Sequence, residues 1–307
     1  MKSRKISLII VTVIFLIAAS YLSFQIYSNG HEFKTHRTEQ AKILDSKQRL
    51  TDWKEWIGNN FDLGSLFSSN KDKGEDSQTS AEYFYGEAVF YSYILAGISF
   101  IYFLFVLFLY RSTTLLCRQL AFALTIIAFV FLFIGISVPM MEIGFFTDML
   151  NFPIEFDVPY INKHVDLTTK FQGRMYFFYQ NKSIMDVIYL LFTHDNIIVA
   201  TALLLFSVVN PLLKLILSLV LVFSPNNKNK VISFIVNNLG KWSMADVFVV
   251  SVFLSYLSIQ NMSTGVESEV STLVGLYFFM TFVVLSIISS MLLKYSIKKQ
   301  KDTVIIN

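Results

Sequence analysis

The chain has 307 residues, of which 54% are hydrophobic and 15% are charged, with a net charge of +3. This balance excludes an ordinary soluble domain and is typical of a polytopic membrane protein. The single cysteine, Cys117, excludes an intrachain disulfide and a cysteine-built zinc site. We expect neither a cofactor nor a nucleic-acid partner.

Six apolar segments approach the roughly 20 residues that a helix needs to cross hydrocarbon. We therefore predict an α-helical polytopic membrane protein with six transmembrane helices. The predicted spans are Ile6–Tyr27, Ala88–Tyr110, Leu120–Val138, Ile197–Phe223, Ser243–Gln260 and Leu273–Leu293.

The distribution of lysine and arginine predicts the orientation of these spans. Basic residues fill the amino end, the second and fourth of the five connections, and the carboxyl tail, where Asp302 is the one acid. The connection before the last span holds Glu267 and Glu269 and no basic residue. Both termini are therefore expected in the cytoplasm. The basic residues are Lys2, Arg4, Lys5, Arg111, Arg118, Lys228, Lys230, Lys241, Lys294, Lys298, Lys299 and Lys301.

The first span has a second interpretation, as a cleaved signal peptide. It begins with basic residues, continues through an apolar stretch and contains the small "AAS" motif near position 20. The apolar stretch continues to Tyr27, which favours a retained span. Either alternative leaves the next segment outside.

The first outward segment, Ser28–Glu87, is predicted to hold a helix over Thr38–Ile57 and then a flexible linker. Ile43, Leu50, Trp53 and Ile57 share one face of that helix. The stretch "SSNKDKGEDSQTSAE", residues 68–82, has the composition of a disordered linker. A tether with a surface helix is favoured over a dedicated binding site.

The second outward segment, Met140–Asn196, carries strand patterns followed by a helix start. "FPIEFDVPYI" alternates apolar and polar residues, and its prolines suggest a sheet edge. "TTKFQGRMYFFYQ" indicates a second strand with a bulge at Gly173. Ser183 and Asp186 form a capping signature for a short helix. We predict a small β-rich unit and a helix between the third and fourth spans.

No catalytic motif appears: there is no phosphate-binding glycine loop, nucleophile elbow or zinc-protease signature. His164 and His194 lie beside Asp166 and Asp195 in the outward unit, where solvated surface residues are the favoured interpretation over a metal site. The chain is therefore not expected to be an enzyme.

The fourth and fifth spans carry polar residues that a lipid-facing helix avoids. Helical spacing places a polar stripe, with Lys214, on one face of the fourth span, and Pro211 is expected to kink this helix at Ser207. Asp246, in the fifth span, lies at a depth that Lys214 reaches by extending toward the cytoplasm. The pair either locks two helices together or forms a coupling site for transport. This polar seam consists of Ser207, Asn210, Pro211, Lys214, Trp242, Ser243 and Asp246.

Four motifs resemble, in order, those of the paraquat-inducible protein A family of bacterial inner-membrane proteins. "LGKWSMADVFVV" is similar to the family signature, and "LFSVVNPLLKL" is similar to the helix before it. "FIGISVPMMEI" and "YFFYQNKSIMDVIYLL" resemble the end of its first helix and the outward segment that follows. The likeness covers residues 115–293.

This resemblance implies a tetraspan, claudin-like module with a β-rich periplasmic insertion. It also implies a place in the bacterial inner membrane, lipid as the transported molecule and a mammalian-cell-entry (MCE) domain protein as the partner. The expected function is a component of intermembrane lipid transport that supports envelope integrity. The alternative is a structural or regulatory subunit that binds a partner without handling substrate.

The chain departs from the family pattern in lacking zinc ribbons, in having one module where members often have two, and in an extra amino-terminal hairpin. The expected domains are this transmembrane hairpin over 1–114, the tetraspan module over 115–295 with its insertion at 140–196, and a basic tail over 296–307.

Overall fold

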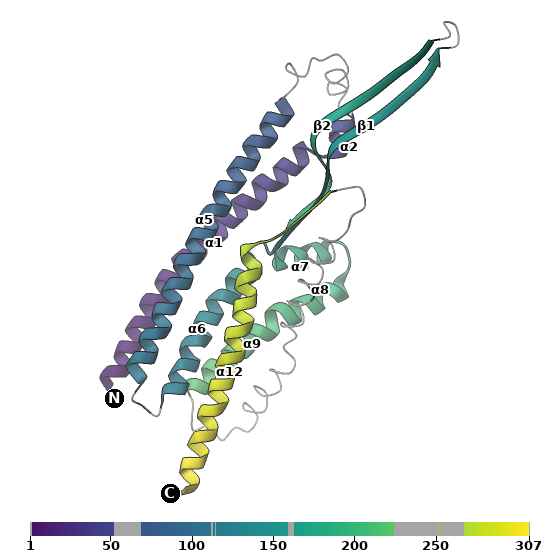
Figure 1. The fold of residues 1–307 in the computed structure, drawn as a ribbon. Helices are drawn as coiled ribbons and strands as arrows, with labels where there is room; N and C mark the ends of the chain where they lie inside the picture. Colours follow the sequence, from purple (N-terminus) through teal and green to yellow (C-terminus); the bar gives the residue numbers. More distant parts are fainter. Residues whose placement is uncertain are drawn as a thin grey trace.

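The computed structural model describes residues 2–51, 69–111, 113, 115–158, 163–223, 251 and 267–306. Helices cluster at one end of the molecule, and a long two-stranded ribbon projects from the other (Figure 1). The helices are α1 (Lys2–Ile43), α2 (Ser46–Thr51), α5 (Ser69–Tyr110), α6 (Leu116–Ser137), α7 (Ile184–Thr193), α8 (Ile197–Leu204), the π-helical turn η1 (Leu205–Val209), α9 (Asn210–Phe223) and α12 (Val274–Ile306). The strands are β1 (Met141–Val158), β2 (Lys163–Lys182) and β3 (Glu267–Thr272).

Five segments of the described residues are long and apolar enough to cross a membrane. They correspond to five of the six predicted spans, with Val138 and Leu273 lying one residue outside. The remaining one, Ser243–Gln260, lies outside the described residues except for Ser251. The five segments are Ile6–Ile43, Gly74–Tyr110, Leu116–Ser137, Ile197–Phe223 and Val274–Ile297.

The amino-terminal hairpin is more regular than the sequence suggested. The helix predicted over Thr38–Ile57 is confirmed only in part: residues 38–43 belong to α1, which continues without a break from the first span, so the predicted start at Thr38 is wrong. Residues 52–57 of that predicted helix lie outside the described residues. After a turn at Leu44 and Asp45, the short helix α2 covers residues 46–51. At 1.5 Å per residue, the 42 residues of α1 extend about 63 Å, twice the thickness of the hydrocarbon layer. The hairpin therefore reaches well beyond the membrane.

The predicted linker over residues 68–82 is also wrong, because α5 begins at Ser69. Tertiary contacts with α1 and the bundle outweigh its disorder-like composition. Ala81 is fully buried in a small cluster with Phe33 of α1 and Leu273. Gln40 of α1 donates a 3.1 Å hydrogen bond to Gln78 of α5. These contacts offset the entropy lost in ordering a polar segment.

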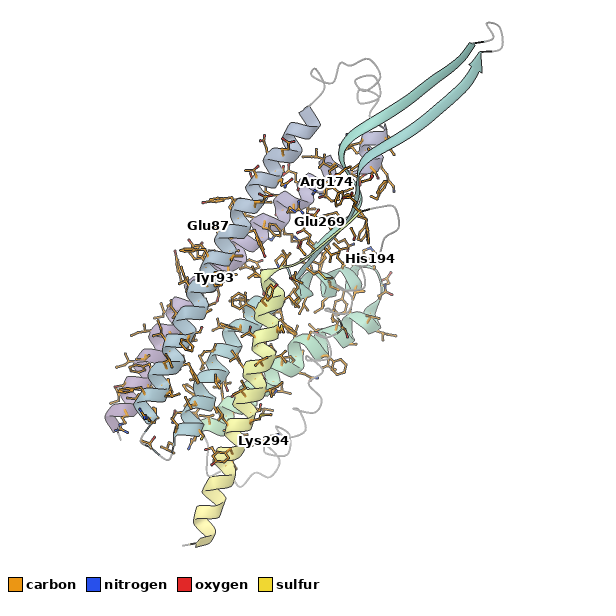
Figure 2. The ribbon with its side chains drawn as sticks, viewed as in Figure 1. Glu87, Tyr93, Arg174, His194, Glu269 and Lys294 are labelled. Carbon is orange, nitrogen blue, oxygen red and sulfur yellow. The ribbon has the colours of Figure 1, made fainter. Side chains whose placement is uncertain are left out.

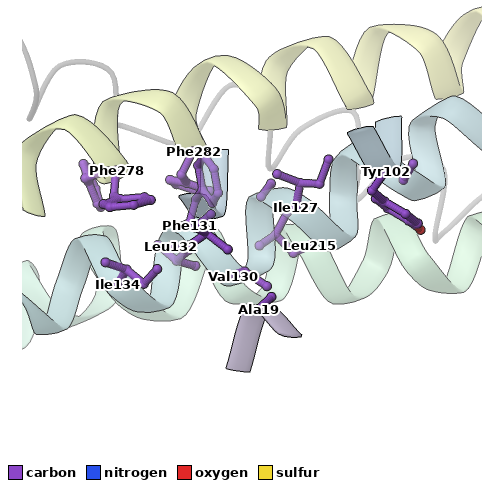
Figure 3. Packing of buried hydrophobic residues seen from close by; sticks show 14 of the residues in the cluster. Ala19, Tyr102, Ile127, Val130, Phe131, Leu132, Ile134, Leu215, Phe278 and Phe282 are labelled. Carbon is purple, nitrogen blue, oxygen red and sulfur yellow. The ribbon is translucent and has the colours of Figure 1, made fainter. Parts of the chain in front are cut away.

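Helix α6 is the central helix of the bundle. Within its apolar window 72% of the residues are buried, against at most 39% in the other four segments. Phe278 and Phe282 of α12 pack against α6 beside Phe131 (Figure 3). Gly135 brings the two backbones together: a Cβ at that position would lie 2.8 Å from the Cα atom of Phe279. Small residues at such crossings allow tight helix packing in membranes.

The predicted β-rich unit is a three-stranded antiparallel sheet in the order β2-β1-β3. Both predicted strands are confirmed and extended. The predicted bulge is confirmed too: Gly173 and Arg174 oppose Asp148 alone, between the pairs Thr147–Met175 and Met149–Gln172. Strand β3 was not predicted. It pairs with only the first six residues of β1, so Pro153 lies on an edge, as expected.

Helix α7 confirms the predicted capping signature. Ser183 accepts a hydrogen bond from the backbone of Asp186, and the Asp186 carboxylate accepts one from the backbone of Ser183. Ile184 and Ile188 are buried against the bundle. The predicted distortion before Pro211 is realised as the π-helical turn η1, since proline cannot donate to the preceding turn.

Candidate functional site

The amino-terminal hairpin is joined to the root of the sheet by a buried ionic cluster. Arg37 of α1 donates from Nε to Oε1 of Glu142 in β1 at 2.8 Å, and from Nη2 to Oε1 of Glu269 in β3 at 2.8 Å. Its Nη1 donates to Gln40 at 2.6 Å. Arg37 and Glu142 are 7% and 3% exposed. One guanidinium thus connects three elements that are distant in sequence.

Tyrosines surround this cluster. The Tyr176 hydroxyl donates to Oε2 of Glu269 at 2.9 Å, and the Arg37 guanidinium lies 5.8 Å from the ring centre of Tyr179. Arg174 lies 4.4 Å above the ring of Phe146, and Figure 2 shows it beside Glu269 at the root of the ribbon. We call Arg37, Glu142, Tyr176 and Glu269 the junction cluster.

Burial is the largest influence on the pKa of Glu142 in the junction cluster. It raises the pKa of the Glu142 carboxyl above its ordinary value; the charge of Arg37 opposes this change and that of Glu269 adds to it. Burial raises the pKa of the Tyr176 and Tyr179 hydroxyls as well. The positive charge of Arg37 therefore favours the ionised form of the buried Glu142 carboxyl, against the effect of burial.

A cavity of about 310 Å³ lies between α1, the carboxyl end of α6 and the start of α7. We call it the junction cavity. Its lining combines a lysine, a histidine, one carboxylate, hydroxyls and apolar groups. The lining residues are Tyr27, His31, Lys34, Ser137, Pro139, Ser183, Met185 and Asp186.

Two residues of the cavity lining, Lys34 and Asp186, form an ion pair. Nζ of Lys34 lies 2.8 Å from Oδ2 of Asp186, which also accepts hydrogen bonds from the backbone and the hydroxyl of Ser183 at 2.8 and 2.7 Å. Burial raises the pKa of the Asp186 carboxyl, but the hydrogen bonds from Lys34 and Ser183 outweigh it, so the pKa lies below its ordinary value. Asp186 is therefore an anionic wall of the cavity at neutral pH.

The hairpin approaches the bundle closely beside this cavity. Gly30 of α1 lies against the junction of α6 and β1, where a Cβ would be 3.0 Å from Cγ1 of Val138. His31 stacks on Tyr27 with ring centres 6.2 Å apart. Tyr27, His31 and Lys34 occupy one face of α1 because they are four and three residues apart. This face is the wall that α1 contributes.

The predicted polar seam faces the bundle interior where the structure describes it. Ser207, Pro211 and Lys214 are buried, and Asn210 is half-buried. Trp242, Ser243 and Asp246 lie outside the described residues, so the pairing of Lys214 with Asp246 stays a prediction.

Helix α6 also contacts the carboxyl end of α9, the helix that carries the described part of the seam. Arg118 donates from Nε to the carbonyl of Val222 at 2.6 Å, which satisfies an acceptor in the last turn of α9. Phe122 and Phe223 meet edge to face, with ring centres 5.5 Å apart. The described part of the seam is therefore held against the central helix.

Sequence reasoning found Asp186 as a helix cap but not as a cavity wall, and it found none of the junction cluster as a site. Arg37 and Glu142 are 105 residues apart, and no periodic pattern connects residues across that distance. Arg37 stands just before the helix predicted over Thr38–Ile57 and among other basic residues, so nothing in the sequence set it apart. His194 is exposed, as predicted, and the side chain of His164 lies outside the described set.

Comparison with known families matches residues 168–296 to the family model described as Paraquat-inducible protein A. The matched region runs from β2 into α12 and covers less than half of the chain. It contains Ser183, Asp186 and all residues of the polar seam, whereas α1 and α5 lie outside it. No curated protein and no solved structure matches the chain.

Proposed function

Because the chain carries a paraquat-inducible protein A domain over residues 168–296, we propose that it is a membrane subunit of an intermembrane lipid-transport system. In this role it loads or unloads lipid, or another hydrophobic molecule, for an MCE-type partner in the periplasm. The chain lies in the bacterial inner membrane with both termini in the cytoplasm, and it has no enzymatic activity of its own.

The observation that carries this proposal is the joining of a family-type membrane domain to a long outward ribbon. Strand β1 has 18 residues, about 60 Å at 3.4 Å per residue. Only Met141–Phe146 of β1 pairs with β3; beyond Phe146, the described pairing of β1 is with β2 alone. A two-stranded ribbon is marginally stable in water by itself. A periplasmic partner that covers the ribbon would supply the missing contacts.

The polar seam offers a place where transport is coupled to a change of helix packing. The π-helical turn Leu205–Val209 precedes the buried side chain of Lys214, and π-helical turns are frequent at functional sites. In the coupling interpretation, the contacts of Lys214 rearrange as the fourth span straightens. In the locking interpretation, they hold the span against its neighbour.

The structural or regulatory alternative receives support from a different observation. The junction cluster ties the amino-terminal hairpin firmly to the sheet, as expected for a rigid platform that presents the ribbon to a partner. In that case the hairpin takes the place of the second module that many family members carry.

The decisive experiment purifies the tagged full chain in mild detergent and identifies bound proteins and bound lipids by mass spectrometry. A second variant has residues 150–171 replaced by Asn-Gly, which closes the ribbon after the pair Met149–Gln172. The full chain is expected to retain both an MCE-type protein and lipid, and the short-ribbon variant to retain lipid alone. Partner without enriched lipid in both samples would favour the structural alternative, and lipid without a partner in the full chain would contradict the assigned role of the ribbon.

A further inference from the structure

We propose that the junction cavity binds the head group of a zwitterionic aminophospholipid, with its phosphate beside Lys34 and His31 and its ammonium group beside Asp186. This inference rests on the proposed function, because it names the class of lipid that the chain handles and the place where the lipid is first held.

The cavity lies at the level of the outer membrane surface. Tyr27 ends the first apolar stretch of α1, and Ser137 is the last residue of α6, so both mark the boundary between hydrocarbon and water. One turn further into the membrane on the same face of α1, Phe24 is 65% exposed. A lipid whose head group occupied the cavity would place an acyl chain along Phe24.

The size of the cavity suits a head group and not a whole lipid. Its volume of about 310 Å³ is at the lower end of small-molecule sites, which span roughly 300–1,000 Å³. Pro139 and Met185 provide apolar surface, and Ser137 provides a hydroxyl. The acyl chains would remain in the bilayer.

The charges of the cavity match both ends of a zwitterion. The side chains of Lys34 and Asp186 are 21% and 31% exposed, and partly exposed ion pairs of this kind are weak enough to exchange partners. A phosphate replaces the carboxylate at Lys34, and a primary ammonium replaces Lys34 at Asp186, so neither charge loses its partner.

Other common head groups fit less well. A glycerol head group brings the phosphate but no cation, and it leaves Asp186 facing a second negative charge. A choline head group brings a cation that cannot donate a hydrogen bond to the carboxylate.

The test measures the thermal stability of the purified full chain against dihexanoyl phosphatidylethanolamine, held below its micelle-forming concentration. Dihexanoyl phosphatidylglycerol and O-phosphoethanolamine are titrated in parallel. The variants are Lys34→Ala and Asp186→Asn, and Lys42→Ala is the matched control because Lys42 is an exposed lysine of the same helix. The ethanolamine lipid is expected to stabilise the parent chain at lower concentration than the glycerol lipid.

Lys34→Ala is expected to raise the dissociation constant for the ethanolamine lipid about tenfold, as for the loss of one charge-assisted hydrogen bond. Asp186→Asn should remove the preference over the glycerol lipid, and Lys42→Ala should change neither. Equal affinities in the parent and Lys34→Ala chains would overturn the proposal. So would equally strong binding of O-phosphoethanolamine, which would assign the cavity to a soluble ligand.

Because Asp186 also caps α7, Asp186→Asn can weaken folding. Native mass spectrometry of the ethanolamine and glycerol lipids that remain bound to each folded variant gives the same comparison without a melting curve. Failure of the site and failure of the proposed function are distinguishable. A Lys34→Ala chain that restores envelope lipid distribution with unchanged lipid affinity refutes the site alone, whereas a deletion strain with normal lipid distribution refutes the transport role alone.

Discussion

At the scale of single residues, Arg37 is a buried charged side chain that connects the amino-terminal hairpin to the sheet. It joins α1 to two strands whose residues follow it by more than a hundred positions. Replacing one member of a buried ion pair lowers the unfolding free energy far more than replacing one member of an exposed pair. The charge that remains stays in a medium of low dielectric constant.

We predict that Arg37→Met lowers thermal stability most at neutral pH and less near pH 5. Burial raises the pKa of Glu142 in the folded chain, and removing Arg37 takes away the charge that opposes this change. The folded state then binds the proton more tightly than the unfolded chain, so the unfolding free energy falls as pH rises. The loss at neutral pH is expected to reach about 3 kcal/mol.

Melting curves of the parent, Arg37→Met and the double variant with Glu142→Gln, each measured near pH 5 and pH 7.5, test this prediction. The double variant should recover part of the loss at neutral pH. A loss for Arg37→Met that is independent of pH would contradict the role given to Glu142.

A second prediction at this scale concerns Gly135. In Gly135→Ala the new Cβ would meet the backbone of Phe279 at 2.8 Å, and backbone atoms cannot move aside as a flexible side chain can. We expect a destabilisation of about 1–3 kcal/mol, as for overpacked cores. Gly97→Ala in α5 is the control, because nothing lies within 4 Å of that Cβ. Similar melting temperatures for the two variants would show that α6 and α12 can separate without cost.

At the scale of elements, some helices are specified by their local sequence and others by tertiary contacts. Helix α7 is specified by its own sequence, through Ser183 and Asp186 and an apolar face. The first turn of α5 has a disorder-like composition and is helical because α1 packs against the residues that follow.

For α7 we predict that Ser183→Ala costs about 1 kcal/mol, the usual contribution of a helix cap. The first-turn amides of α7 should exchange hydrogen faster, which hydrogen–deuterium exchange mass spectrometry measures directly. Thr193→Ala is the control, since its hydroxyl bonds within the same helix at an exposed position. Unchanged exchange in Ser183→Ala would show that burial of Ile184 and Ile188, and not the cap, sets the start of α7.

For the polar seam we predict that Lys214→Met or Asp246→Asn alone lowers stability by as much as about 3–5 kcal/mol, and that the double variant recovers part of it. If the pair only locks two helices, envelope function should return with stability. If it is a coupling site, stability should return without function. Additive losses in the double variant would refute the pairing.

At the scale of the whole molecule, the structure brings together the segments that the charge pattern assigned to the outside. The end of α1, the start of α5, the β sheet and α7 gather at one end, while Lys294 of α12 lies toward the opposite end (Figure 2). This arrangement agrees with both termini on the same side of the membrane.

The topology is tested by single cysteines in a Cys117→Ser background. Thr193→Cys and Tyr295→Cys place exposed thiols at the two ends of the bundle. An impermeant thiol reagent added to cells with a permeable outer membrane should label the first and leave the second unlabelled until the inner membrane is broken. The reverse pattern would overturn the orientation.

The sequence by itself determined the elements whose signals are local. Apolar runs of sufficient length predicted five of the spans now described, and the period-two pattern predicted the ribbon with its bulge at Gly173. The capping residues predicted the start of α7. These signals are readable because each is contained within one or two turns of helix or one strand.

Only the tertiary structure decided the length of the hairpin, the third strand, the junction cluster and the junction cavity. Helix α5 exists where composition favours disorder, because Ala81 and Gln78 gain contacts with another helix. Strand β3 is too short for a periodic pattern to stand out and is fixed by its pairing with β1. Lys34 and Asp186 form an ion pair although 152 positions separate them, because only the fold determines which distant charged residues lie within reach of each other.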